Sequence, residues 1–213
     1  MRITVFGATG GTGRQVVQQA LDGGHEVVAP VRHPDRLTIR HDRLEVLAGD
    51  VLDPATLPGP VDGADAVIST IGGRSKAERV AGLQGPGTSN IIAAMQAAGT
   101  RRLLVVSAAP LAEADPHDSI AYRLILKPLI SRILRTAYAD MGRMERAVRD
   151  SGLEWTIVRP PQLTNKPRTG HYRTELDRTV RRGYRISRGD LAELLLRSID
   201  DATTVKAIVA VGY

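Results

Sequence analysis

Hydrophobic residues along the chain fall into short, nearly unbroken runs, which are separated by longer stretches of mixed polar and apolar residues. Each run has the length and the valine- and isoleucine-rich composition of a β-strand buried in a sheet. Seven runs are expected to form strands, the last of them closing the sheet: 2–6, 25–32, 44–48, 64–73, 101–109, 153–161 and 205–212.

Between the runs, apolar residues recur every three or four positions, which is the spacing of one helix face. Helices are expected after Gly13, over 87–98, over 138–150 and near 187–199, where Ser187 or Asp190 caps the helix. This alternation predicts an α/β protein with a Rossmann-like, doubly wound, mainly parallel sheet and helices on both faces. The length suits a single domain, 1–213, in which about 108–213 contributes the substrate side.

Three glycines lie between the first strand and the first helix. Gly7, Gly10 and Gly13 are spaced three residues apart. A residue without Cβ lets the backbone turn sharply and lets a pyrophosphate approach it, and the N-terminus of the helix favours negative charge. Strand, glycine turn and helix in this order predict a dinucleotide-binding site.

The residues after the second strand predict which dinucleotide is bound. An NAD site has an acidic residue about 20 positions past the glycines, whereas this chain has Arg32, followed by Arg36. A guanidinium group pairs with the 2′-phosphate of NADP(H), so NADP(H) is favoured over NAD(H). Asp35 is an alternative ribose acceptor and weakens this preference.

Further candidate residues follow the other strands, at the edge where ligands of such sheets bind. Asp50 is suited to the adenine amino group, but capping of a short helix that begins at Pro54 is an alternative role. Ile71 and Gly72 end the fourth strand. Ser107 ends the fifth strand, where it either orients a ligand as a catalytic residue or ties down the strand end.

Two segments of the second half have no single interpretation. The apolar stripe over 119–136, which Pro128 breaks or kinks, fits a buried face or subunit interface, a lid or a membrane-surface helix. The segment 162–182 is polar and is expected to be a substrate-side loop.

Composition narrows the function. The chain has no cysteine, so thiolate metal sites and thiol nucleophiles are excluded, and we expect no metal. The net charge of +6 is spread along a chain with few aromatic residues, which argues against a nucleic-acid partner. No apolar run is long enough to span a bilayer, and the first residues enter a strand at once, so we expect no signal peptide and a cytoplasmic location.

Several motifs together resemble the atypical short-chain dehydrogenase/reductases, in particular the flavin reductase/biliverdin reductase B group, its NAD(P)H-binding relatives and the NmrA-like proteins. The resemblance runs over essentially the whole chain. It is carried by GATGGTG at 7–13, Val31-Arg32, GDV at 49–51, DAVISTIGG at 65–73, Ser107, SGLEWTIVRPPQL at 151–163 and ISRGDLAELLL at 186–196.

The resemblance implies a role for each matching residue. Gly7, Thr9, Gly10, Gly11, Thr12 and Gly13 would hold the pyrophosphate, Arg32 and Arg36 the 2′-phosphate, Asp50 and Val51 the adenine, Ile71, Gly72 and Arg74 the ribose and phosphate region, and Ser107, Pro161, Gln162 and Leu163 the nicotinamide. The flavin reductases have a histidine at the position of Gln162, so the contact of that residue with substrate need not carry over.

The chain departs from the wider superfamily in one respect. Alcohol dehydrogenases of that superfamily use a Tyr-x-x-x-Lys pair, but Leu126 is four residues after Tyr122, and Gly142 is four residues after Tyr138. Alcohol–ketone interconversion is therefore in doubt.

We expect an NADPH-dependent oxidoreductase that passes hydride to a flavin, quinone or similar conjugated acceptor, which needs orientation more than a strong protein acid. The acceptor is a small molecule, covered by the loop that carries Arg168, His171, Tyr172 and Arg173, and the protein is a monomer or homodimer. A non-catalytic NmrA-like sensor of NADP(H) and an epimerase-like activity are the alternatives.

Overall fold

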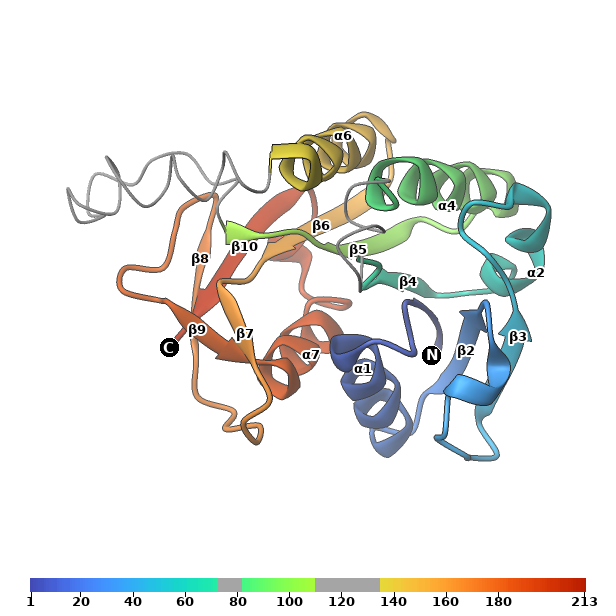
Figure 1. Ribbon diagram of the computed structural model, residues 1–213, viewed down its shortest axis with the longest axis horizontal. Coiled ribbons are helices and arrows are strands. Elements are labelled where there is room, and N and C mark those ends of the chain that lie inside the picture. Colours follow the sequence, from blue (N-terminus) through green and yellow to red (C-terminus); the bar gives the residue numbers. More distant parts are fainter. Residues whose placement is uncertain (73–81, 110–134) are drawn as a thin grey trace.

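The structure is a computed structural model that describes residues 1–72, 82–109 and 135–213. Within these residues, eight strands form one sheet in the order β3-β2-β1-β4-β5-β6-β10-β8 (Figure 1). The strands are β1 (Arg2–Phe6), β2 (Glu26–Val31), β3 (Leu44–Ala48), β4 (Ala66–Ser69), β5 (Arg102–Val106), β6 (Glu154–Arg159), β8 (Arg173–Leu176) and β10 (Ala207–Gly212). All neighbours pair in parallel except β8, which is antiparallel to β10.

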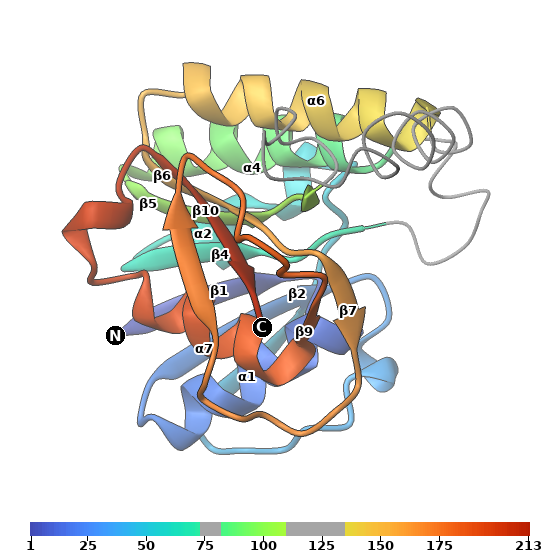
Figure 2. The same cartoon turned by 90° about the vertical axis from the view of Figure 1, so that its left-hand side faces the viewer.

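Helices cover both faces of the sheet, as the sequence predicts. Helices α1 (Gly11–Asp22) and α7 (Arg188–Arg197) lie on one face, and α4 (Gln84–Ala98) and α6 (Arg135–Asp150) lie on the other (Figures 1 and 2). Side chains alternate between two cores: Val5 packs with α1 and α7, whereas Phe6 packs with α4 and α6. The chain therefore has the doubly wound, Rossmann-like architecture, and the carboxyl ends of its parallel strands share one edge.

Short helical turns complete the described segments: the 3₁₀ turns η1 (Pro34–Arg36), η2 (Pro54–Thr56) and η5 (Ala202–Thr204), and the short helix α2 (Pro58–Val61). No helix in the described part of the chain is long and apolar enough to cross a membrane. The predicted apolar stripe at 119–136 falls almost wholly outside the described residues.

The expectation of a loop over 162–182 was wrong for two parts of that segment. Strand β7 (Gln162–Thr164) pairs in parallel with β9 (Arg185–Ser187), and β8 pairs with β10. Strand β10 is therefore not the outermost strand, since β8 extends the sheet beyond it. All four residues of β8 are exposed, so its pairing rests on main-chain hydrogen bonds that no hydrophobic pattern reveals.

Helix α4 begins three residues earlier than expected because a distant carboxylate caps it. Asp140, on α6, accepts hydrogen bonds from the backbone N–H of Gln84 at 2.8 Å and of Gly85 at 3.1 Å. At α7, the two cap alternatives resolve to Ser187, whose side chain accepts a hydrogen bond from the N–H of Asp190 at 3.0 Å.

Candidate functional site

The glycine turn between β1 and α1 is closed by a hydrogen bond between its own backbone atoms, and Gly11, the first residue of α1, is exposed. Gly7 has φ of +80°, and its carbonyl accepts a 2.8 Å hydrogen bond from the N–H of Gly10. A Cβ on Gly13 would lie 2.2 Å from that same carbonyl oxygen, so only glycine lets α1 start this close to the turn. No side chain caps α1, and its first turn has no acidic residue, which leaves its N–H groups and dipole to an anion.

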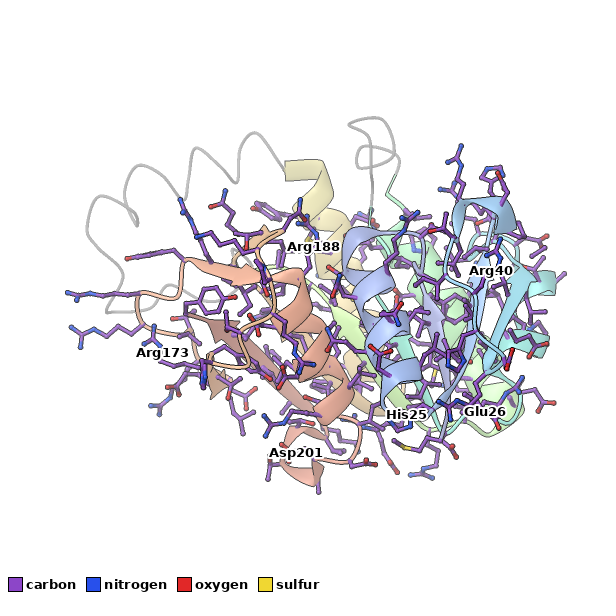
Figure 3. The ribbon with its side chains drawn as sticks, turned by 90° about the horizontal axis from the view of Figure 1, so that it is seen from below. His25, Glu26, Arg40, Arg173, Arg188 and Asp201 are labelled. Atoms are coloured by element: carbon purple, nitrogen blue, oxygen red, sulfur yellow. The ribbon has the colours of Figure 1, made fainter. Side chains whose placement is uncertain are left out.

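Arg188 is a basic residue of this site that the sequence interpretation missed. A Cβ placed on Gly11 would lie 2.7 Å from both Cδ and Nε of Arg188, so the arginine stem lies against the first residue of α1 (Figure 3). Its Nη1 donates a 2.6 Å hydrogen bond to Asn165 Oδ1, and within the described residues the structure records no ion pair for it. The sequence could not reveal this contact, because Arg188 lies 177 positions after Gly11.

A buried carboxylate holds the start of α7, and with it Arg188, in place. Asp190 accepts hydrogen bonds from the N–H groups of Thr169 (2.9 Å) and Gly170 (2.8 Å), from the Ser187 hydroxyl (2.8 Å) and from the Tyr213 hydroxyl. Burial raises the pKa of Asp190, but these hydrogen bonds outweigh burial and lower the pKa below its ordinary value.

Because the folded pKa of Asp190 lies below the unfolded pKa, its contribution to stability is complete above about pH 4 and is lost as the pH falls further. We expect Asp190→Asn to destabilise the protein by about 1–3 kcal/mol at pH 7, and by less at pH 3, where protonation of Asp190 in the unfolded chain removes part of the wild-type advantage. Urea unfolding at both pH values measures the gap between the two proteins, and a gap that does not narrow at pH 3 would contradict this assignment.

The predicted 2′-phosphate residues lie at the carboxyl end of β2. Arg32 follows this strand directly, and Arg36 lies in η1; both are exposed, as is Asp35. Arg14, on α1, donates a 2.7 Å hydrogen bond to the carbonyl of Arg36 and so ties η1 to the helix that follows the glycine turn. Arg14 was not among the predicted residues, although a basic residue directly after Gly13 could have indicated a contact near the glycine turn.

Asp50 does not cap the turn at Pro54. Its Oδ1 accepts a 3.0 Å hydrogen bond from the N–H of Leu52, and Asp53 caps η2 instead by accepting from Ala55 at 3.2 Å. The capping alternative was therefore wrong for Asp50. Val51 packs against α4, because a Cβ on Gly87 would lie 2.8 Å from Val51 Cγ2.

The remaining predicted residues lie after β4 and β6. Ile71 is buried, and its carbonyl accepts a 3.1 Å hydrogen bond from Gln84; Gly72 precedes residues 73–81, so Arg74 lies outside the described residues. Gln162 is exposed at the start of β7, and Leu163 packs against the α1 and α7 core. Pro161 joins β6 to β7.

Two residues of the segment expected to cover an acceptor have partners within the protein. The Nε of Arg168 lies 3.3 Å from Glu193, and Arg173 donates a 2.7 Å hydrogen bond to the carbonyl of Tyr213. Figure 3 shows Arg173 well apart from Arg188.

Ser107 is buried at the end of β5, with its hydroxyl 2.7 Å from Oε1 of Glu145 on α6. The sequence interpretation missed Glu145 and its partner Arg159. Burial raises the pKa of Glu145, but hydrogen bonds from Arg159 and Ser107, together with the charges of Arg159 and Arg149, lower it below its ordinary value. The hydrogen bond to Glu145 is the kind of contact expected if Ser107 ties down the end of β5.

Comparison with known proteins identifies the family. Residues 7–202 match the family model described as NAD(P)H-binding. A (4-alkanoyl-5-oxo-2,5-dihydrofuran-3-yl)methyl phosphate reductase of Streptomyces griseus is 34% identical over 74% of this chain, although the match spans only 46% of that relative. YhfK of Bacillus subtilis, an uncharacterized sugar epimerase by name, is 30% identical over 96% of this chain and 90% of its own.

The fold has solved counterparts. A wide-type short-chain dehydrogenase/reductase of Veillonella parvula, solved in complex with NADP, superposes with a TM-score of 0.80 over 100% of this chain and 94% of its own, at 19% identity. The family match covers the glycine turn, the strand ends and α7 alike. The chain therefore belongs to the NAD(P)H-binding, oxidoreductase-like family of Rossmann-fold proteins.

Proposed function

We propose that this protein binds NADP(H) along the carboxyl edge of its sheet and passes hydride to a flavin, a quinone or a similar conjugated acceptor. The observation that carries the proposal is the glycine turn, where an uncapped helix N-terminus, two close backbone approaches at Gly7 and Gly13, and the guanidinium of Arg188 meet. Together they provide hydrogen-bond donors and positive charge for a pyrophosphate.

The cofactor-binding residues follow from this placement. The pyrophosphate would lie on the turn 7–13, the 2′-phosphate beside Arg32 and Arg36, the adenine beside Asp50 and Val51, and the nicotinamide between Ser107 and 161–163. Two exposed arginines at the end of β2 support NADP(H) over NAD(H), since a guanidinium pairs with the extra phosphate.

The bound cofactor would supply the hydride. The described part of the chain offers no Tyr-x-x-x-Lys pair, because Gly142 is four residues after Tyr138 on α6. An acceptor that takes hydride into a conjugated system fits such a site better than a ketone that needs a protein acid. The name of the Streptomyces griseus relative, a reductase of an unsaturated phosphate-bearing ring, supports a conjugated and anionic acceptor.

The test is to mix the pure protein with NADPH and, one at a time, FMN, riboflavin, quinones and biliverdin, and to follow nicotinamide absorbance. We expect acceptor-dependent oxidation of NADPH, faster than oxidation of NADH at equal concentration. Binding of NADPH without oxidation by any acceptor would contradict the reductase assignment.

Arg188 provides a separate prediction about affinity. Arg188→Gln removes one charge from the pyrophosphate side, so we expect NADPH and NADH to bind about tenfold to 100-fold more weakly, by similar factors. Arg197→Gln, at the other end of α7 and exposed, is the matched control and should leave both affinities unchanged. Fluorescence titration measures the affinities for NADPH and NADH. Unchanged affinities in Arg188→Gln would show that Arg188 does not contact the cofactor.

Two alternative functions each have one specific observation in their favour. The match to YhfK over nearly the whole chain supports an epimerase-like activity, and the missing tyrosine–lysine pair supports an NmrA-like sensor without turnover. Equal affinity for NADP⁺ and NADPH, no turnover, and a partner retained on a column only in the presence of cofactor would favour the sensor.

A further inference from the structure

Glu145 is a buried, ionised carboxylate at the carboxyl edge of the sheet. Only 3% of the residue is exposed, and its two oxygens accept four hydrogen bonds. Oε1 accepts from Ser107 Oγ at 2.7 Å and from Arg159 Nε at 2.9 Å, and Oε2 accepts from Arg159 Nη2 at 2.6 Å and from Arg149 Nη2 at 2.8 Å. Such a group is fully occupied as an acceptor.

The cluster joins three elements at the predicted nicotinamide end of the site. Ser107 follows β5, Arg159 ends β6, and Glu145 lies on α6. Along β5, Leu103 and Val105 face the α4 and α6 core, so the alternation of a strand also directs Ser107 towards α6. The N–H of Ser107 donates a 2.8 Å hydrogen bond to Val158, which fixes the backbone beside the hydroxyl.

The direction of the Ser107 hydrogen bond follows from the charge of its partner. An ionised carboxylate only accepts hydrogen bonds, so the serine hydroxyl must donate its single hydrogen to Glu145. The oxygen of Ser107 then has only lone pairs left for any other contact. It can accept a hydrogen bond from a ligand, but it cannot donate one to a ligand carbonyl.

We propose that Glu145 is a positioning residue that fixes Ser107 as a hydrogen-bond acceptor, for which the matching ligand group is the carboxamide NH₂ of the nicotinamide. This inference rests on the proposed function. It assigns Ser107 to orientation of the cofactor. The serine would then donate neither a proton nor a hydrogen bond to the molecule that takes the hydride, in agreement with a conjugated substrate that needs no protein acid.

The test compares the affinities of NADPH and of its 3-acetylpyridine analogue, in which an acetyl group that cannot donate replaces the carboxamide. The quantity of interest is the dissociation constant of the analogue divided by that of NADPH, measured in each variant; a higher ratio means a stronger preference for NADPH. We expect Ser107→Ala to lower the wild-type preference for NADPH by about threefold to tenfold, the size of one neutral hydrogen bond.

Glu145→Gln is expected to lower the same ratio. A glutamine amide can donate to Ser107, which frees the hydroxyl hydrogen to turn towards the acetyl carbonyl of the analogue. Arg149→Gln is the matched control, because it removes the more exposed partner of Glu145 and leaves Ser107 and Arg159 in place; its ratio should equal that of wild type.

If Glu145→Gln does not fold, the double variant Glu145→Gln/Arg159→Gln removes both buried charges together and is expected to lower the ratio in the same way. A wild-type ratio in Ser107→Ala, or in a folded Glu145 variant, would overturn the inference and leave the cluster a purely structural tie. Absence of binding by both compounds to wild type would instead overturn the proposed function.

Discussion

Gly13→Ala is expected to weaken NADPH binding about 100-fold and to destabilise the fold. The new Cβ would lie 2.2 Å from the carbonyl oxygen and 2.7 Å from the carbonyl carbon of Gly7, and neither backbone atom can move aside without shifting the turn. Overpacking of this kind costs about 1–3 kcal/mol of stability. Displacement of the α1 N-terminus also removes hydrogen bonds to the pyrophosphate, and losing two of them weakens binding about 100-fold.

Gly142→Ala is the matched control, since it places the same methyl group in the interior of a helix. A Cβ at Gly142 meets only the Arg146 guanidinium, at 3.9 Å, and we expect this variant to be up to about 1 kcal/mol more stable than wild type with unchanged affinity. Calorimetric titration with NADPH and thermal unfolding measure both effects. Wild-type affinity in Gly13→Ala would show that the turn does not hold the cofactor.

Arg32→Glu is expected to change which cofactor the protein prefers. The substitution removes a charge-assisted contact with the 2′-phosphate and adds a repulsive carboxylate, so NADPH binding should weaken by about 2–4 kcal/mol while NADH binding changes little. Arg32 is exposed after β2, so the fold should tolerate the change.

The control for a general electrostatic effect is Lys206→Glu, which changes the net charge equally. Lys206 is exposed directly before β10, at the amino end of that strand and so at the opposite edge of the sheet. Its NADPH affinity should match wild type. Equal losses for NADPH and NADH in Arg32→Glu would refute the role of Arg32 in selecting the phosphorylated cofactor.

Local sequence signals predicted most of the architecture because the hydrophobic pattern of a segment reflects how that segment is buried. Such a pattern can be recognised without knowing which other segments pack against it. The runs that became β1 and β2 are buried at nearly every position, and the partly buried Leu44 and Val46 of β3 pack against the same core. The convergence of strand ends then follows from parallel pairing alone.

The features that the sequence did not reveal all depend on contacts between distant segments. Strand β8 is exposed and is held by backbone pairing, and α4 begins early because Asp140 reaches it from α6. Arg188 against Gly11 and Glu145 against Ser107 are side-chain encounters that only the tertiary structure defines. Polar residues of this kind have no periodicity that marks a partner far along the chain.

Calorimetric titration of the folded wild-type protein with NADPH and, separately, with NADH tests directly whether the glycine turn binds a dinucleotide. We expect saturable binding of one NADPH per chain, with NADH binding more weakly by the factor that Arg32 provides. Absence of heat with both dinucleotides, in a protein whose circular dichroism shows the expected fold, would contradict a dinucleotide site at the glycine turn.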